Sequence, residues 1–266
     1  MFKTRLLSGI VLVAAALALI LTGHEVLLIA ACGISLIGMF ELYRVYKIER
    51  TKAAVIGYLS AVLYYLDLYF HWMPDRMLFV WAVLVGLLVV YVFSYPKYHI
   101  SQITAAFFAL FYVAVPLSCI YQIRDMEKGA YIVWLVFLCS WGCDTCAYCV
   151  GVRFGRHKMS PVLSPKKSIE GAVGGIVGTF LLTALYSGVF RGQMGITGAQ
   201  VWSLSAISAA GGLFSMVGDL SASAIKRNHG VKDYGKLIPG HGGILDRFDS
   251  VIFTAPAIYY LTEYLL

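Results

Sequence analysis

Long runs of apolar residues alternate with short polar segments along almost the whole chain. Each run is about 20 residues long, the length an α-helix needs to cross a bilayer, whereas a membrane-barrel strand would be about half as long. We therefore expect an all-α, polytopic integral membrane protein with about nine transmembrane helices. The expected spans are residues 6–22, 26–43, 53–72, 77–95, 102–122, 129–150, 171–190, 201–222 and 244–265.

The position of the charges predicts how these spans are oriented. The 266 residues are 60% hydrophobic and 13% charged, which excludes a soluble globular domain. With a cytoplasmic N-terminus, 17 of the 21 Lys and Arg residues fall on the cytoplasmic side. The net charge of +7 therefore reflects membrane orientation, and we expect no nucleic-acid partner. The C-terminus is then on the opposite side, and both long polar loops, 151–170 and 223–243, face the cytoplasm.

The chain shows no internal repeat, linker or low-complexity segment, so we expect a single transmembrane domain, 1–266. Residues 1–128 carry few candidate chemical groups, and we expect them to be mainly structural or lipid-facing. In this part Glu41 and Arg44 stand three positions apart, a spacing typical of a structural ion pair on a helix. Residues 129–266, with their cytoplasmic loops, carry the candidate active site.

Charge is densest from Ser223 to Asp249, beside an otherwise apolar chain. Gly240, Gly242 and Gly243 come just before an apolar run that starts at Ile244. A glycine turn at a helix N-terminus presents free N–H groups to anions, and neighbouring carboxylates can hold a divalent metal. The pattern indicates a polyphosphate site; the alternative is a solvated loop that anchors helix ends.

A second group of polar residues lies between 144 and 170. Asp144 falls deep in an apolar helix, where a carboxylate is costly enough to indicate a function; a protonated helix–helix hydrogen bond is the alternative. Lys166 and Lys167 suit phosphate binding. Ser168 is expected to cap the next helix, with Glu170 in its first turn.

Three polar side chains share a helical face at the end of the eighth expected span. Asp219, Ser223 and Lys226 are spaced i, i+4 and i+7, so together they can hold a metal-bound phosphate near the cytoplasmic interface. Asp246 and Asp249 open the last helix, where they are either ligands or partners of the helix dipole.

The stretch 223–249 resembles the signature of the phosphatidate cytidylyltransferases, also called CDP-diacylglycerol synthases. The positions that carry the resemblance are Ser223, Lys226, Arg227, Lys232, Asp233, Gly235, Pro239, Gly240, His241, Gly242, Gly243, Asp246, Arg247 and Asp249. A second segment is similar to the same family through Asp144, Ala147, Tyr148, Ser164, Pro165, Lys166, Lys167, Glu170 and Gly171. Ser168 and Ile169 stand where the family more usually has Thr and Trp, a mild departure that leaves the charged positions intact.

The resemblance implies that CTP and phosphatidate are converted to CDP-diacylglycerol and pyrophosphate at the cell inner (plasma) membrane, with a multi-pass chain whose active site faces the cytoplasm. It implies Mg²⁺ as cofactor and leaves a second cation and a homodimer open. The metal ligands it implies are Asp219, Asp246 and Asp249. The catalytic residues it implies are Asp144, Lys167, Asp219, Lys226 and Asp246. The substrate-binding residues it implies are Lys166, Ser223, Arg227, Lys232, Asp233, His241, Gly242, Gly243 and Arg247.

Two other functions compete with this hypothesis. A CTP-dependent lipid kinase of the polyprenol or phytol type would also use CTP, but would transfer the γ-phosphate to a hydroxyl group. A cation transporter would use Asp144, Asp219 and Asp246 as an ion path, but would not need the basic glycine loop.

Overall fold

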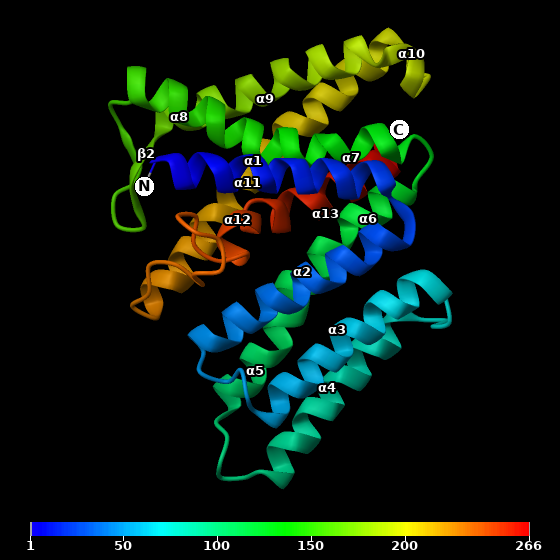
Figure 1. The fold of residues 1–266 in the computed structure, drawn as a ribbon, viewed down its shortest axis with the longest axis vertical. Helices are drawn as coiled ribbons and strands as arrows, with labels where there is room; N and C mark the ends of the chain where they lie inside the picture. Colours follow the sequence, from blue (N-terminus) through cyan, green and yellow to red (C-terminus); the bar gives the residue numbers. More distant parts are fainter. Residues whose placement is uncertain (1, 266) are drawn as a thin grey trace.

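The computed structural model describes residues 2–265, and the side chains of residues 8–264. The chain folds as a bundle of long helices with one small hairpin (Figure 1). The elements are α1 (Phe2–Thr22), α2 (His24–Val45), α3 (Lys52–Phe70), α4 (Arg76–Phe93), α5 (Ile100–Ala109), η1 (Leu110–Ala114), α6 (Val115–Asp125), α7 (Gly129–Phe137), η2 (Leu138–Gly142), α8 (Cys143–Phe154), β1 (Lys158–Ser160), β2 (Ser164–Ser168), α9 (Ile169–Val189), α10 (Arg191–Met194), α11 (Gly198–Asn228), α12 (Leu245–Phe248) and α13 (Val251–Leu265).

Seven helices of the described chain are long and apolar enough to cross a membrane. They are α2, α3, α4, the continuous α5–η1–α6, the continuous α7–η2–α8, α9 and α11. The first expected span corresponds to α1, which has 21 residues, and the last corresponds to α12 and to α13, which has 15 residues. The N-terminus, the hairpin and α12 lie at one end of the bundle, and the C-terminus lies toward the other (Figure 1).

Helix α11 is the longest element, with 31 residues. At 1.5 Å per residue it is about 46 Å long, well beyond the roughly 30 Å of a hydrocarbon core. Its last turns therefore extend the helix past the apolar layer and carry Asp219, Ser223 and Lys226 toward the polar end of the bundle, on one continuous helix as the spacing predicts.

Two spanning helices each contain one π-helical turn. The first, η1, ends at Ala114, two residues before Pro116. The proline has no N–H to donate, and its ring would collide with the preceding turn of a regular helix. The second, η2, ends at Gly142, two residues before Asp144. It changes the helical register immediately before that carboxylate.

The segment 151–170, expected to be a polar loop, contains an antiparallel hairpin. Strands β1 and β2 pair Lys158 with Ser168 and Ser160 with Ser164. The expected cap is confirmed, because the Ser168 hydroxyl accepts a hydrogen bond from the Gly171 amide at 3.1 Å. The hairpin thus joins α8 to α9 with a defined geometry and fixes Lys167 next to the start of α9.

Helices α8 and α9 pack closely because α9 is rich in glycine on the contact side. A Cβ atom at Gly174 would lie 2.5 Å from the Val150 side chain, and one at Gly178 would lie 2.5 Å from Cys146. Any side chain at these positions would push the helices apart. Small residues at such positions are typical of closely packed helices in membranes.

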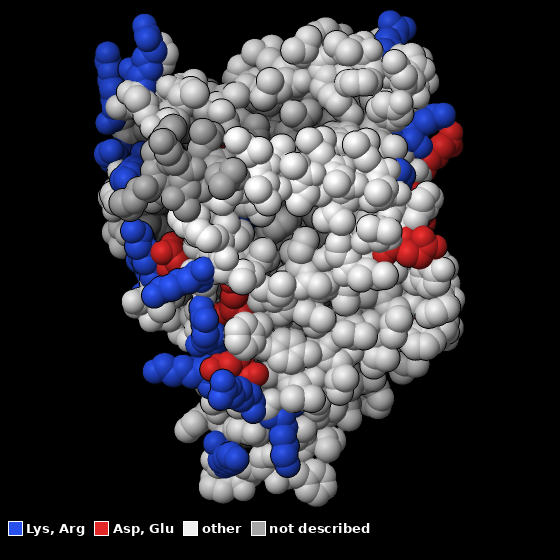
Figure 2. Space-filling model, viewed as in Figure 1, with Lys and Arg blue, Asp and Glu red and all other residues white. Residues whose placement is uncertain are grey.

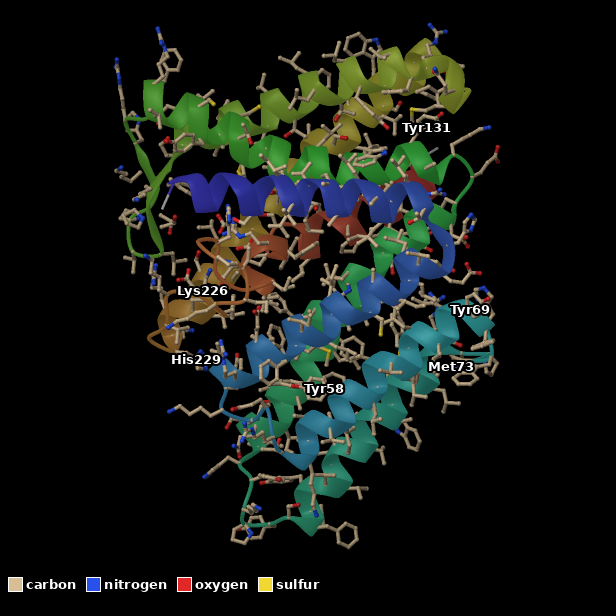
Figure 3. The ribbon with its side chains drawn as sticks, in the orientation of Figure 1. Tyr58, Tyr69, Met73, Tyr131, Lys226 and His229 are labelled. Carbon is tan, nitrogen blue, oxygen red and sulfur yellow. The ribbon has the colours of Figure 1, made fainter. Side chains whose placement is uncertain are left out.

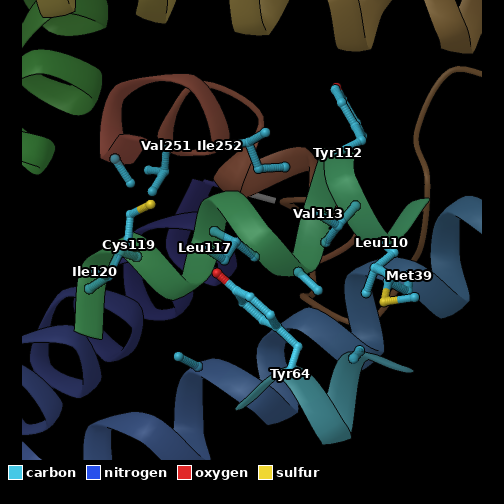
Figure 4. Packing of buried hydrophobic residues seen from close by; sticks show 14 of the residues in the cluster. Met39, Tyr64, Leu110, Tyr112, Val113, Leu117, Cys119, Ile120, Val251 and Ile252 are labelled. Carbon is cyan, nitrogen blue, oxygen red and sulfur yellow. The ribbon is translucent and has the colours of Figure 1, made fainter. Parts of the chain in front are cut away.

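A second body of packing joins α2, α3, α5, α6 and α13 around buried side chains such as Met39, Leu110, Leu117 and Ile252 (Figure 4). Polar groups in this core are largely paired within the protein. The Tyr43 hydroxyl donates to the Ala106 carbonyl at 3.0 Å. Such pairing is needed where no water is available.

Lys and Arg side chains gather along the edge of the molecule that carries the N-terminus, the hairpin and α12, and fewer lie at the opposite edge (Figure 2). Between the two edges the visible surface is almost free of charge. This is the distribution expected of a protein that spans a bilayer with most of its cations on one side.

Candidate active site

The end of the bundle that carries α12 contains a cavity of about 380 Å³ where α1, α8, α11 and the segment 241–250 meet. Asp144, Asp219, Asp246 and Asp249, drawn from three separate parts of the sequence, all line it. The wall contributed by α1 is apolar, and consists of Gly9, Leu12, Val13, Ala15, Ala16 and Leu19. The cavity therefore offers a charged side and a hydrocarbon side to whatever it binds.

Asp246 is the most fully engaged of the four carboxylates. Its side chain is only 3% exposed, and its Oδ1 accepts a hydrogen bond from the Lys226 ammonium at 2.8 Å. Its Oδ2 accepts the backbone N–H groups of Tyr234 at 2.8 Å and Gly243 at 2.9 Å. Gly242 adopts φ +86°, and a Cβ there would lie 2.8 Å from this oxygen. Asp246 thus organises the glycine turn as well as lining the cavity.

Lys226 is correspondingly placed inside the protein and not in open solvent. Its side chain is 12% exposed and its ammonium lies 5.2 Å from the centre of the Tyr234 ring. Figure 3 shows Lys226 at the polar end of the bundle, near His229. As the structure stands, the ammonium that the sequence analysis assigns to phosphate is paired with Asp246.

Asp219 forms an ion pair with Lys167, which reaches it from β2. Both side chains are about a quarter exposed. The hairpin therefore delivers a cation to the carboxylate of α11, although the two residues are 52 positions apart in the chain. Of the two lysines expected to bind phosphate, Lys167 is the one at the carboxylates, whereas Lys166 is exposed on the hairpin.

Ser250 connects the remaining two carboxylates. Its hydroxyl lies 3.3 Å from Asp144 Oδ2 and 3.4 Å from Asp249 Oδ1. Asp249 lies in the turn between α12 and α13, outside the seven spanning helices. Burial, reinforced by the nearby Asp219 carboxylate, raises its pKa to about 7. A cation bound here would stabilise the ionised Asp249 carboxylate, whose pKa is raised by burial first and by Asp219 second.

A second cavity of about 650 Å³ lies beside the glycine loop itself. It is lined by polar and glycine-rich residues: Lys232, Asp233, Gly235, Lys236, Ile238, Pro239, Gly240, His241, Gly242 and Arg247. His241 and Arg247 line both cavities, so the two adjoin at these side chains. The His241 ring also contacts α1, because its Nδ1 lies 2.7 Å from the Ser8 hydroxyl.

Arg247 has an available donor at this junction. Its Nε is buried and has no hydrogen-bond partner among the described residues. A buried guanidinium nitrogen of this kind is suited to a phosphate oxygen. Of the other predicted substrate residues, Ser223 is half-buried on α11, whereas Arg227, Lys232 and Asp233 are exposed.

Oxygen ligands around the first cavity suit a hard cation such as Mg²⁺, but they form no complete cage. Within residues 2–265, no three His, Cys, Asp or Glu side chains are arranged to hold a metal ion between them. Mg²⁺ is commonly bound by one or two carboxylates together with substrate phosphates and water. The donor set therefore fits a metal that binds together with its nucleotide.

Sequence reasoning missed two residues of the N-terminal half that hold this site. The expected ion pair between Glu41 and Arg44 is not among the ion pairs of the described residues. Instead the Glu41 carboxylate accepts the N–H groups of Ile244 at 3.1 Å and Leu245 at 2.8 Å, and Arg44 donates to the Tyr234 carbonyl at 2.9 Å. Their partners lie about 200 positions further along the chain, so spacing within one helix could not reveal them. The one available signal was a carboxylate at the end of an apolar span.

Comparison with known proteins identifies the family of this chain. The profile of the cytidylyltransferase family matches residues 3–265. A Staphylococcus aureus (strain COL) protein named phosphatidate cytidylyltransferase is 36% identical, over 97% of this chain and 98% of its own length. A Thermotoga maritima protein of the same name is 33% identical, over 99% of this chain and 97% of its own length, and one from Staphylococcus epidermidis is 34% identical. The chain belongs to the cytidylyltransferase family.

Proposed function

We propose that this protein is a phosphatidate cytidylyltransferase, a transferase of phospholipid biosynthesis that makes CDP-diacylglycerol and pyrophosphate from CTP and phosphatidate. The observation that carries the proposal is the pair of adjoining cavities: a polar, lysine-bearing one at the glycine loop, and one with carboxylates on one side and the apolar face of α1 on the other. The match to the cytidylyltransferase family over nearly the whole chain supports it.

The two cavities suit the two substrates separately. CTP is a soluble polyanion, and the cytoplasmic cavity offers Lys232, Lys236 and the glycine turn to its phosphates. Phosphatidate has a phosphate headgroup on an apolar body, and the inner cavity has one wall of each kind. The reaction then takes place at the junction, where Arg247 and His241 face both sides.

In the transfer itself, an oxygen of the phosphatidate phosphate attacks the α-phosphorus of CTP. A new P–O bond forms, the bond from the α-phosphorus to the oxygen bridging to the β-phosphorus breaks, and pyrophosphate leaves with that electron pair. The attacking phosphate has a second pKa of about 6, so at cytoplasmic pH most of it is already the dianion. The dianion is a nucleophile and needs no strong general base. Lys167 and Arg247 hold the non-bridging oxygens and stabilise the charge that develops on them.

One or two of the carboxylates Asp219, Asp246 and Asp249 would hold Mg²⁺ together with substrate phosphates, with Asp144 beside them. When bound, Mg²⁺ supplies charge neutralisation for the phosphates of two anionic substrates. Asp246 keeps its Oδ2 for the loop amides, so only its other oxygen, which Lys226 now neutralises, is free to exchange partners. A second cation at the same acidic cluster is compatible with the proposal.

The charge distribution supports an orientation with the N-terminus and both cavities on the cytoplasmic side of a plasma (inner) membrane. The hairpin, the glycine loop and most cations share one end of the bundle, and CTP is available on that side. Fluorescence or protease accessibility of tags at the two termini tests this orientation. Association as a homodimer stays a prediction, which native mass measurement in detergent tests.

Purified protein with phosphatidate and radiolabelled CTP provides the decisive assay. We expect label from the α-phosphorus to enter the lipid, and label from the γ-phosphorus to be released in pyrophosphate. Transfer of the γ-label to lipid would instead show a CTP-dependent kinase. Absence of any labelled lipid with active, folded protein would refute the proposal.

A further inference from the structure

Glu41 belongs to the N-terminal half of the chain, and its side chain contacts the glycine loop of the C-terminal half. Helix α2 packs against α12, and the Glu41 side chain near its end is buried, with the residue only 3% exposed. None of the ion pairs of the described residues includes it. A buried carboxylate without a paired cation is costly, so the hydrogen bonds that it makes must account for its place.

Those hydrogen bonds follow a regular order along the chain. Three consecutive backbone amides donate to carboxylates: Gly243 to Asp246 Oδ2, Ile244 to Glu41 Oε1, and Leu245 to Glu41 Oε2. Two carboxylates therefore accept hydrogen bonds from the turn that leads from the glycines into α12. One belongs to the loop itself and the other comes from a distant span.

The glycines on either side of this contact show how close it is. A Cβ atom built at Gly243 would collide with both carboxylate oxygens of Glu41, and one built at Gly235 would collide with Oε1. The absence of a side chain at both positions is thus explained by the approach of Glu41. Arg44, one turn further along, holds the same loop through the Tyr234 carbonyl.

We propose that Glu41 is a positioning residue for the nucleotide: it fixes the glycine turn and the start of α12, and so sets where His241 and Arg247 stand between the two cavities. Glu41 is not among the residues that line either cavity, so it acts through the loop and not on the substrate. The proposal rests on the cytidylyltransferase function above. It assigns a role in CTP binding to a span that otherwise carries no chemistry.

The test compares Glu41→Gln with a matched control at a buried carboxylate far from the site. Asp67 is also 3% exposed, and its Oδ1 accepts the Met73 amide at 2.8 Å. Met73 lies at the opposite end of the bundle from Lys226 (Figure 3). Because Gln keeps one acceptor and loses the other, we expect Glu41→Gln to raise the KM for CTP about 10- to 100-fold. The KM for phosphatidate should change little. Both variants should lower the melting temperature to a similar extent, because each removes an acceptor from a buried backbone amide, but Asp67→Asn should leave both KM values unchanged.

A double-mutant cycle with Gly243 separates positioning from general stability. Gly243→Ala alone should lower kcat/KM for CTP strongly, because its methyl group meets the Glu41 carboxylate. In a Glu41→Ala background the same methyl should cause little further loss, since the obstructing group is gone. Additive effects of the two substitutions would overturn the inference.

The remaining outcomes also decide between the two proposals. A wild-type protein that makes no CDP-diacylglycerol would refute the function. An active wild type together with a Glu41→Gln variant of unchanged KM for CTP would refute only the role of Glu41. Equal kinetic losses in Glu41→Gln and Asp67→Asn would show a general structural effect, and would also refute it.

Discussion

Replacing Asp246 by Asn should destabilise the glycine loop, and this structural effect should be seen whether or not a metal is bound. Asp246 and Lys226 form a nearly buried pair, with side chains 3% and 12% exposed, and the same carboxylate accepts two backbone amides. Asn removes the charge that pairs with the Lys226 ammonium and replaces one acceptor by a donor.

The expected size of the effect follows from the burial of both partners. Removing one partner of a buried, hydrogen-bonded ion pair costs about 3 to 5 kcal/mol, because the other charge is left buried and unpaired. For a chain of this size, such a loss corresponds to a fall in melting temperature on the order of 10 °C. Turnover should be lost as well, since the loop carries His241 and Arg247.

The assay is thermal unfolding in detergent, followed by intrinsic fluorescence, beside CDP-diacylglycerol synthesis over a range of Mg²⁺ concentrations. A second variant, Lys226→Met with Asp246→Asn, should recover part of the lost stability, because it removes the unpaired ammonium. A single Asp246→Asn variant with a wild-type melting temperature, whose activity returns at high Mg²⁺, would refute the reasoning. In that case Asp246 would act only as a metal ligand.

Three further predictions test the site and the packing that supports it. Lys167→Gln should lower kcat for CDP-diacylglycerol synthesis about 100-fold or more, a loss of roughly 3 kcal/mol of transition-state stabilisation. Lys166→Gln, at an exposed position of the hairpin, should retain most of this activity. Gly174→Ala should destabilise the protein by about 1 to 3 kcal/mol because its methyl group meets Val150; Gly188→Ala, which meets nothing within 4 Å, should unfold at the wild-type temperature. Chelation of divalent ions should abolish turnover, and added Mg²⁺ should restore it; full activity after thorough chelation would exclude the metal from the mechanism.

Much of the architecture could be predicted because membrane helices are encoded locally. The length of each apolar run, the glycine spacing in α9 and the cap at Ser168 depend on neighbours within a few turns. The common helical face of Asp219, Ser223 and Lys226 could be predicted for the same reason. The hairpin at 158–168 was missed because its short polar strands lack the apolar alternation typical of strands.

The partners within the site were harder to predict, because they join distant parts of the chain. Charge density and glycines indicated an anion site, yet neither could show that Lys226 pairs with Asp246 while Lys167 pairs with Asp219. Glu41 shows the same limit, since its expected partner at i+3 was wrong and its actual partners are the amides of Ile244 and Leu245 at the start of α12. Spacing within a helix describes one helix, whereas a site of this kind is made by contacts between helices.

We expect the length of α11 to couple catalysis to the lipid environment. The apolar part of this single helix packs within the bundle, and Asp219 and Lys226 lie near its C-terminal end. A change in the tilt of α11 would therefore move both charged groups together relative to the lipid headgroups. A thinner or thicker membrane alters the tilt that such a helix prefers. An enzyme built in this way would adjust its rate of lipid synthesis to the thickness of the bilayer that it helps to make.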